Sequence, residues 1–229
     1  MIGITFALPS ESSDLVRRVR AVERSDNLLS GKIDNRDVTI LHTGVGAKNQ
    51  RLEFLLHKAR PRLVISTGFA GAVSEQLRVG DLVLAQNFSD SQLLTSAERI
   101  LRDRQPQLVK LFTSTSIVDS IAERNKIARR AGAGAIDMET GAIVGVCNAH
   151  GVPLLSLRAI SDTPVQPFPM PPSVLFDVER EQARYGRLLA YLLRRPASIW
   201  RLFRFARQVA RARAALTDAI VALVRELPH

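Results

Sequence analysis

Four acidic residues stand where the sequence pattern places the ends of strands or the loops after them: Glu11, Asp137, Glu139 and Asp162. Gathered around one cleft, such residues suit cleavage of a glycosidic bond. One protonated carboxyl group assists the leaving group, a second carboxylate orients a nucleophile, and negative charge stabilises an oxocarbenium-like sugar. Each acid also has an ordinary structural interpretation, as the cap of a helix or turn or as a solvent-facing residue at a helix start.

The other candidate groups carry weaker signals. Residues 43–46 and 67–71 are glycine-rich and form either tight turns or backbone N–H sites, but no Gly-Lys-Ser/Thr follows them, which excludes a P-loop. His42 and His150 lack matching partners, so we interpret them as structural, and no ligand spacing predicts a metal site. Cys147 lies in an apolar stretch and is interpreted as a core residue.

Alternating apolar runs and amphipathic stretches predict the elements that position these residues. Strands are predicted over residues 2–8, 27–33, 38–42, 63–66, 79–87, 109–118 and 152–160. Helices are predicted from residue 14 onward and over residues 48–59, 120–131, 140–149, 177–194 and 197–227, with residues 88–107 irregular or helical. Glycine-rich loops after the strands indicate an α/β fold with a largely central sheet and a ligand site at the carboxyl ends of the strands.

Composition restricts the class of protein. Of the 229 residues, 46% are hydrophobic and 24% are charged, which argues against disorder and low complexity. The single cysteine excludes a disulfide scaffold and the start lacks the basic residues of a signal peptide, so we expect a cytoplasmic protein. No stretch offers the roughly 18 uninterrupted apolar residues of a membrane-spanning helix. The net charge is +10, and residues 180–229 carry +8 of it, so the basic character belongs to a C-terminal tail.

This tail is predicted to form an amphipathic helix. Its two faces consist of Arg201, Arg204, Arg207 and Arg211 on one side and Leu202, Phe205, Val209, Ala212, Leu216 and Leu223 on the other. Two placements stay open. With Trp200 and Phe203 the arginines suit contact with an anionic membrane, whereas the apolar face suits packing against the body or a second subunit. No recognition motif supports nucleic acid as a partner.

Six short motifs occur together in one order. They lie at residues 7–11, 43–46, 66–71, 79–83, 137–140 and 158–162 and read ALPSE, TGVG, STGFAG, VGDLV, DMET and RAISD. This set resembles nucleoside phosphorylase family I, most closely the branch with methylthioadenosine/S-adenosylhomocysteine nucleosidases and hopanoid-associated nucleoside phosphorylases. The resemblance implies a three-layer α/β catalytic domain over residues 1–165 with a mixed, partly barrel-like central sheet, in a homo-oligomer. A proline-rich loop and a helical extension then occupy residues 166–229.

The resemblance implies a role for each matching residue. Asp162 matches the aspartate that protonates or hydrogen-bonds the purine at N7, with Ser161 in support. Glu139 matches the glutamate that binds the ribose hydroxyls, and Met138 matches the side chain packed against the sugar. Glu11 matches the glutamate that activates water in the nucleosidases.

The remaining matches form two groups. The substrate-binding positions are Val118, Thr67 and Gly68. The positions of a pocket for water or phosphate are Thr43, Gly44 and Arg158. Val118 matches the residue whose backbone holds the purine edge. Arg158 has a second interpretation, because it can form a structural salt bridge with Glu11 or Glu139.

We therefore predict an enzyme that cleaves the N-glycosidic bond of a purine nucleoside. The predicted substrate is a 5′-modified adenosine resembling adenosylhopane, and the predicted reaction is phosphorolysis with release of adenine, with phosphate as co-substrate and no cofactor. Hydrolysis, as in the nucleosidases, is the alternative. The rival from another class is a non-catalytic nucleoside-binding protein at the membrane periphery, in which the basic tail performs the function.

Overall fold

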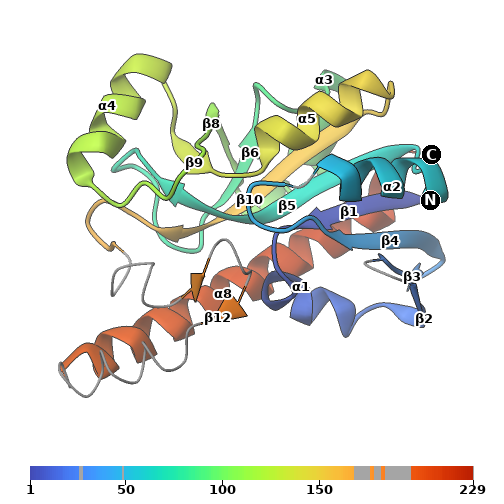
Figure 1. The fold of residues 1–229 in the computed structure, drawn as a ribbon, viewed down its shortest axis with the longest axis horizontal. Coiled ribbons are helices and arrows are strands. Elements are labelled where there is room, and N and C mark those ends of the chain that lie inside the picture. Colours follow the sequence, from blue (N-terminus) through green and yellow to red (C-terminus); the bar gives the residue numbers. More distant parts are fainter. Residues whose placement is uncertain (26–27, 48, 168–175, 178–181, 184–196, 229) are drawn as a thin grey trace.

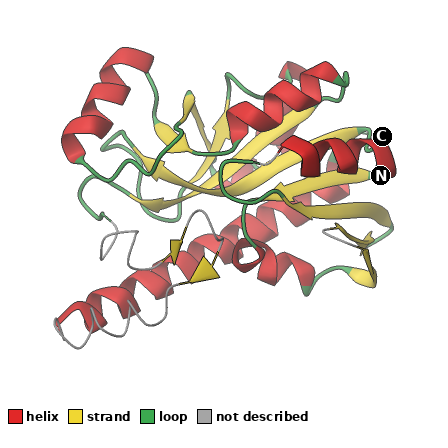
Figure 2. Cartoon of the chain, viewed as in Figure 1, coloured by secondary structure: helices red, strands yellow, loops and turns green. Residues whose placement is uncertain are grey.

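The structure is a computed structural model that describes residues 1–25, 28–47, 49–167, 176–177, 182–183 and 197–228. Its centre is one ten-stranded mixed sheet (Figures 1 and 2). The strands are β1 (Ile2–Phe6), β2 (Arg20–Ser25), β3 (Leu28–Ile33), β4 (Arg36–His42), β5 (Leu63–Ala72), β6 (Leu82–Ala85), β7 (Gln107–Val109), β8 (Leu111–Thr113), β9 (Ala135–Asp137) and β10 (Leu154–Asp162).

The strand order is β2-β3-β4-β1-β5-β10-β6-β7, and β9 pairs with both β5 and β8. The four neighbours β4, β1, β5 and β10 run parallel, so their carboxyl ends meet at one edge of the sheet. Strands β2 and β3 pair antiparallel beside β4, and β6 pairs antiparallel with β10. The parallel centre therefore creates a single place where residues from several strand ends converge.

Helices cover both faces of this sheet. They are α1 (Pro9–Val16), α2 (Asn49–Ala59), α3 (Ser91–Ile100), α4 (Ile121–Ala131), α5 (Thr140–Ala149) and α8 (Ala197–Glu226). A short 3-10 turn, η1 (Arg102–Arg104), follows α3, and β11 (Phe176–Asp177) pairs with β12 (Gln182–Ala183) in a separate ribbon.

Alternating side chains along the strands build one core on each face. Ile65 of β5 packs in one cluster with Leu216 of α8, and α1 and α3 contribute to that same cluster. The neighbouring Val64 belongs to the opposite cluster, with Leu55 of α2 and Cys147 of α5. Successive residues of a strand point to opposite faces of the sheet, so both faces are apolar and both are covered by helices. The result is three layers: helix, sheet and helix.

Helix α8 has two halves with different surroundings. From residue 212 onward a stripe at helical spacing is buried, formed by Ala212, Leu216, Ala219, Ile220, Leu223, Val224 and Leu227. Arg213 pairs with Asp14 of α1 at 2.8 Å. The preceding turns project beyond the sheet in Figure 1, and Trp200 and Phe203 on them are 78% and 57% exposed. The C-terminal half thus packs against the body, one of the placements left open by the sequence.

The α/β fold with a mixed central sheet is confirmed, but several predicted elements differ. The segment 67–71 is not a loop, because β5 continues through it while Thr67, Gly68, Phe69 and Ala70 stay paired with β10. The polar edge strand β2 was not predicted, since all its side chains are exposed and it shows no apolar alternation. The predicted strand 109–118 is divided between β7, β8 and a loop, and α3 forms within the segment predicted as irregular or helical.

The predicted helix over residues 177–194 conflicts with the β11–β12 pair at its described residues, and the rest of it lies outside the described residues. In the part of the chain that the structure describes, no helix is long and apolar enough to cross a membrane.

Candidate active site

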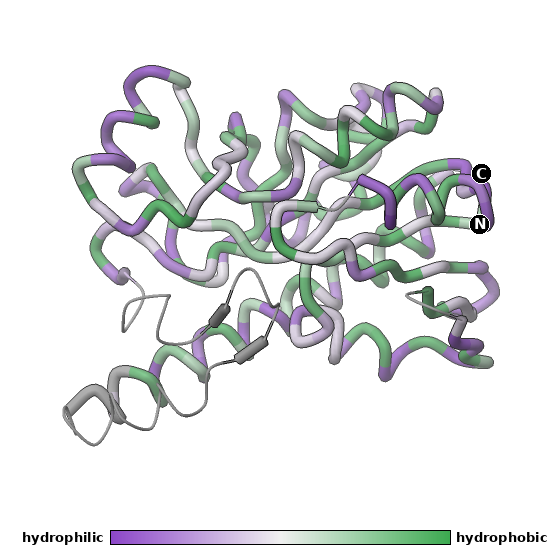
Figure 3. Tube along the Cα trace, in the orientation of Figure 1, coloured by the Kyte–Doolittle hydropathy of each residue, from purple (hydrophilic) through white to green (hydrophobic). Residues whose placement is uncertain are grey.

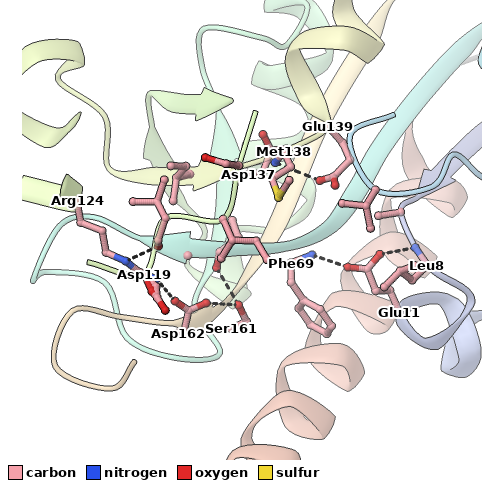
Figure 4. A pocket seen from close by; sticks show the side chains of 18 of the residues that line it. Leu8, Glu11, Phe69, Asp119, Arg124, Asp137, Met138, Glu139, Ser161 and Asp162 are labelled. Atoms are coloured by element: carbon pink, nitrogen blue, oxygen red, sulfur yellow. Dashed lines mark hydrogen bonds and ion pairs between the residues drawn. The ribbon is translucent and has the colours of Figure 1, made fainter. Parts of the chain in front are cut away.

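A cavity of about 500 Å³ opens at the carboxyl ends of the central strands. Its walls come from the loop after β1, the second half of β5, the loop before α4, the β9–α5 junction and the end of β10. Predicted site residues that line it are Glu11, Val118, Met138, Glu139, Ser161 and Asp162 (Figure 4). The parallel pairing of β10 with β5 and the pairing of β9 with β5 bring the acids of these separate segments together.

One end of the cavity is formed by Asp162 at the end of β10. Its side chain is 6% exposed and accepts a hydrogen bond of 2.6 Å from the Ser161 hydroxyl on Oδ1. Its other oxygen, Oδ2, pairs with the guanidinium of Arg124. Arg124 also donates to the carbonyl oxygens of Val118 and Ala72, at 3.1 and 2.9 Å. The carboxyl group is therefore held from two sides at one wall of the cavity.

Arg124 was absent from the predicted site. Helix α4 is strongly hydrophilic (Figure 3), and Arg124 is its one buried residue. Its position in the sequence could have revealed it. Arg124 lies on the same side of the helix as Ile127 and Ala128, which pack against a core cluster. A charged residue on the inward face of a helix requires a buried partner.

The middle of the cavity is formed by Met138 and Glu139 at the start of α5. The Glu139 carboxylate accepts hydrogen bonds from the Gly46 and Met138 N–H groups, both at 3.3 Å. Burial, followed by the charges of Asp137 and Glu11, raises its pKa from 4.5 to about 7. Near neutral pH this group is therefore poised between its protonated and ionised forms.

The opposite end is formed by Glu11 in the first turn of α1. Its carboxylate accepts from the Leu8 N–H at 3.0 Å and from the Phe69 N–H at 3.4 Å. Burial raises the pKa of Glu11, and these N–H donors and the charge of Arg158 oppose the rise. Strand β5 comes close to the Glu11 carboxylate at Gly68. This residue has a φ of +147°, and a Cβ added to it would lie 3.3 Å from Glu11 Oε1, so the position requires glycine.

Arg158 is 2% exposed and pairs with Asp137, a residue that lines the cavity. Its guanidinium pairs with Asp137 at 3.1 Å and donates to the hydroxyls of Ser66 and Thr140, both at 2.8 Å. Arg158 therefore forms a buried salt bridge, as its second interpretation predicted, but the partner is Asp137 rather than Glu11 or Glu139. The charge of Arg158 still acts on both glutamates, because it opposes the rise of their pKa values.

Five predicted positions do not line the cavity, although the structure describes all of them: Thr43, Gly44, Thr67, Gly68 and Arg158. The Thr43 hydroxyl lies 3.2 Å from the carbonyl oxygens of both Phe6 and Gly44 and donates within the backbone. The Thr43 hydroxyl and the Arg158 guanidinium are therefore both engaged by groups of the protein itself.

The remaining reactive groups lie elsewhere. His42 shares a 2.8 Å hydrogen bond with Ser12, and burial lowers the pKa of His42. Cys147 is buried between α5 and α2, where burial raises its pKa to about 12. Across the described ranges, no group of three or more His, Cys, Asp or Glu residues is placed to hold a metal ion.

Three acidic residues follow one another along the cavity. Figure 4 shows Asp162 with Ser161 and Arg124 at one end and Glu11 at the other, with Met138 and Glu139 between them. Such spacing suits a two-part ligand with a leaving group at Asp162, a centre that gains positive charge at Glu139, and a nucleophile at Glu11.

Comparison with known proteins is consistent with this geometry. The family profile described as the phosphorylase superfamily matches residues 1–99 and 87–195. The 5′-methylthioadenosine/S-adenosylhomocysteine nucleosidase of Staphylococcus haemolyticus is 26% identical over 196 residues, which cover 71% of this chain and 86% of that protein.

Solved structures share the fold. A 5′-methylthioadenosine/S-adenosylhomocysteine nucleosidase from Colwellia psychrerythraea in complex with adenine superposes with a TM-score of 0.75 at 16% identity, covering 99% of this chain and 95% of that one. The futalosine hydrolase of Helicobacter pylori superposes with a TM-score of 0.72 at 16% identity, covering 99% and 97%.

Proposed function

The chain belongs to the phosphorylase superfamily, and from this premise we propose that it cleaves the N-glycosidic bond of a purine nucleoside by hydrolysis and releases adenine. The curated relative named above is a nucleosidase, and one neighbouring structure holds adenine. Within the cavity, the observation that carries the proposal is the partly buried carboxylate of Glu11 opposite Asp162 (Figure 4).

Glu11 has the properties of a general base for water. Its two oxygens are fixed by the Leu8 and Phe69 N–H groups, and burial raises its pKa toward the range in which a carboxylate accepts a proton efficiently. A water molecule between Glu11 and the sugar then loses its proton to Glu11 as its oxygen bonds to C1′. Glu139, ionised at and above about pH 7, stabilises the positive charge on the sugar.

Asp162 serves the leaving group. In its protonated form, Asp162 gives its proton to the purine at N7 while the electron pair of the C1′–N9 bond passes to the base. The Ser161 hydroxyl on Oδ1 orients the carboxyl group. Met138 lies beside Glu139 on the cavity wall, where its side chain packs against the sugar.

Hydrolysis is favoured over phosphorolysis because, among the residues that the structure describes, the cavity has few donors for a phosphate. Arg158 is engaged by Asp137, and the Thr43 hydroxyl is engaged by backbone carbonyls. A phosphate at the Glu11 end would instead approach the two carboxyl groups of Glu11 and Glu139. Like charges at short range disfavour that arrangement, whereas a neutral water is compatible with it.

The test measures free adenine and the sugar product from adenosine and methylthioadenosine, with and without phosphate. We expect equal adenine release in both conditions, with free ribose or its 5′-modified form as the sugar product. Glu11→Gln should lower kcat at least about 10²-fold, while Glu53→Gln, the same change at an exposed position of α2, should not. Phosphate-dependent formation of a sugar 1-phosphate would instead establish the phosphorylase reaction.

The 5′ substituent is proposed to be apolar. Leu8, Val45, Phe69 and Pro167 line the cavity, and Leu8 and Phe69 lie next to the Glu11 end in Figure 4. Apolar walls favour substrates with alkyl groups at about 25 cal/mol per Å² of buried surface. A long-chain 5′-alkyl adenosine, of the adenosylhopane-like class, should therefore show a lower KM than adenosine, and an equal KM would refute this specificity.

A second proposal concerns the first half of α8, which we propose contacts an anionic membrane. Trp200 and Phe203 are among the most exposed large apolar residues, and Arg204, Arg207 and Arg211 on the same turns are exposed as well. Between Glu181 and Asp218 the sequence contains no acidic residue. Aromatic and arginine side chains together match an anionic lipid surface in polarity and charge.

This half of α8 also lies close to the rim of the cavity. Gln208 donates to Gln166 at 3.3 Å, and the adjacent Pro167 lines the cavity. Sedimentation with phosphatidylserine-containing vesicles should fall in the Trp200→Ala/Phe203→Ala variant, whereas Phe54→Ala, at an exposed aromatic residue of α2, should have no effect. Equal sedimentation of both variants would reject the membrane contact.

A further inference from the structure

The end of the cavity formed by Asp162 carries a further acid, Asp119, for which the proposed reaction has no role. Asp119 lines the cavity, and its side chain is exposed. Figure 4 shows it at the same end as Asp162 and Arg124. Among the residues that the structure describes, none donates a hydrogen bond to the Asp119 carboxylate or forms an ion pair with it. The carboxylate is therefore available to a ligand in the cavity.

The loop that carries Asp119 is fixed on both sides. Before it, the Ser114 N–H donates to the last carbonyl oxygen of β9 at 2.8 Å. Next to it, the carbonyl oxygen of the buried Val118 accepts from Arg124 Nε at 3.1 Å. Arg124 in turn pairs with Asp162. This chain of contacts holds Asp119 close to the acid proposed to protonate the purine.

Other acceptors at this end are already engaged. Oδ1 of Asp162 accepts from the Ser161 hydroxyl, and Oδ2 of Asp162 pairs with Arg124. The Val118 carbonyl oxygen also accepts from Arg124. These contacts leave Asp119 as an acceptor that no described residue engages.

The chemistry of the purine gives this acceptor a partner. Adenine presents the N7 acceptor and the 6-amino donor side by side on one edge, whereas a 6-oxopurine presents two acceptors there. With N7 at Asp162, the substituent at C6 is the next group along that edge. A carboxylate on the same wall can then accept a hydrogen bond from a 6-amino group.

We propose that Asp119 is a specificity-determining residue that accepts a hydrogen bond from the 6-amino group and selects 6-aminopurine over 6-oxopurine nucleosides, an inference that rests on the proposed function. A carboxylate offers only acceptors, so a 6-oxo group would face it with no proton between the two oxygens. The oxo substrate loses the hydrogen bond and also meets a like partial charge.

Three nucleosides that differ at C6 test this assignment: adenosine, inosine and purine riboside, which has only hydrogen at C6. We expect Asp119→Ala to lower kcat/KM for adenosine about tenfold. The value for purine riboside should stay within about twofold, because this substrate has no amino group to lose. Asparagine offers both a donor and an acceptor, so Asp119→Asn should narrow the ratio of adenosine to inosine cleavage about tenfold.

The matched control is Glu123→Gln, which removes an exposed acid from the first turn of the helix that follows Asp119. It should leave all three values at those of the wild type. Equal losses on adenosine and purine riboside in Asp119→Ala would show that the residue only shapes the loop, and would overturn the assignment. An unchanged ratio of adenosine to inosine cleavage in both Asp119 variants would overturn it as well.

Calorimetry with the free bases separates this assignment from the proposed reaction. Wild-type protein should bind adenine about tenfold more tightly than hypoxanthine, and Asp119→Ala should lose this preference. The same result in a protein that cleaves no nucleoside would support the assignment and overturn the proposed function. Equal affinity of the wild type for both bases, together with active hydrolysis, would overturn the assignment alone.

Discussion

Replacing Glu139 by Gln should stabilise the protein at alkaline pH while removing its activity. The folded-state pKa of Glu139 is about 7, above the value of 4.5 for an unperturbed glutamate. The stability that the protonated group contributes is thus fully present below about pH 4.5 and is lost as pH rises through 7. A glutamine has no proton to lose, so the variant avoids this penalty.

The expected size follows from the pKa. A rise from 4.5 to about 7 corresponds to about 3 kcal/mol between the two protonation states. At pH 8 the wild type bears nearly the whole penalty, and at about pH 5 it bears little of it. Glutamine offers one oxygen to the Gly46 and Met138 N–H groups where glutamate offers two, but this loss is the same at both pH values. The difference in stability between the proteins should therefore change by about 2 kcal/mol between pH 5 and 8.

Thermal unfolding at pH 5, 6.5 and 8 measures this change. For a chain of this length, about 2 kcal/mol corresponds to roughly 4–8 °C in Tm. The Tm of the variant relative to that of the wild type should rise by this amount between pH 5 and pH 8. The variant should release no adenine. A Tm difference that is constant with pH would refute the reasoning, because burial would then impose no ionisation penalty on Glu139.

Three further predictions follow from the same contacts. Asp162→Asn should abolish base release while nucleoside affinity, measured by calorimetry, stays within about tenfold; unchanged turnover would contradict the acid role. Gly68→Ala should impair kcat and stability together, because its φ is +147° and its new Cβ would contact the Glu11 carboxylate; crystallographic or kinetic equivalence to the wild type would disprove this constraint. Cys147, with its pKa raised to about 12 by burial, should resist alkylation by iodoacetamide at pH 8 until urea unfolds the chain; rapid labelling of the native protein would show that the thiol is accessible.

The sequence could place Asp162 at the edge where parallel strands end, because the apolar run over residues 152–160 leads to it, whereas no strand was predicted before Glu139. In the structure β9 and β10 both pair with β5, which places these acids around one cavity. Glu11 was predictable for the same reason, as it follows the first strand, which also pairs with β5. A sequence that indicates where strands end can therefore predict which residues converge at one edge of the sheet.

The partners of the buried arginines could not be predicted in this way. Arg158 lies on a buried strand among several acids, and spacing alone does not decide between Asp137, Glu11 and Glu139. The choice of Asp137 depends on the turn into α5, where Thr140 also donates to that carboxylate. Arg124 pairs with a residue 38 positions away, so only the docking of α4 brings the two together.

Two buried arginines explain how this site holds so many carboxyl groups. Five acids line the cavity, and burial raises the pKa of two of them, Glu11 and Glu139. Arg158 pairs with Asp137 and opposes the rise in the pKa of Glu11 and Glu139. Arg124 pairs with Asp162 at the far end. One cation therefore lies beside Asp162 and the other beside Asp137, and together they balance part of the negative charge around the cavity.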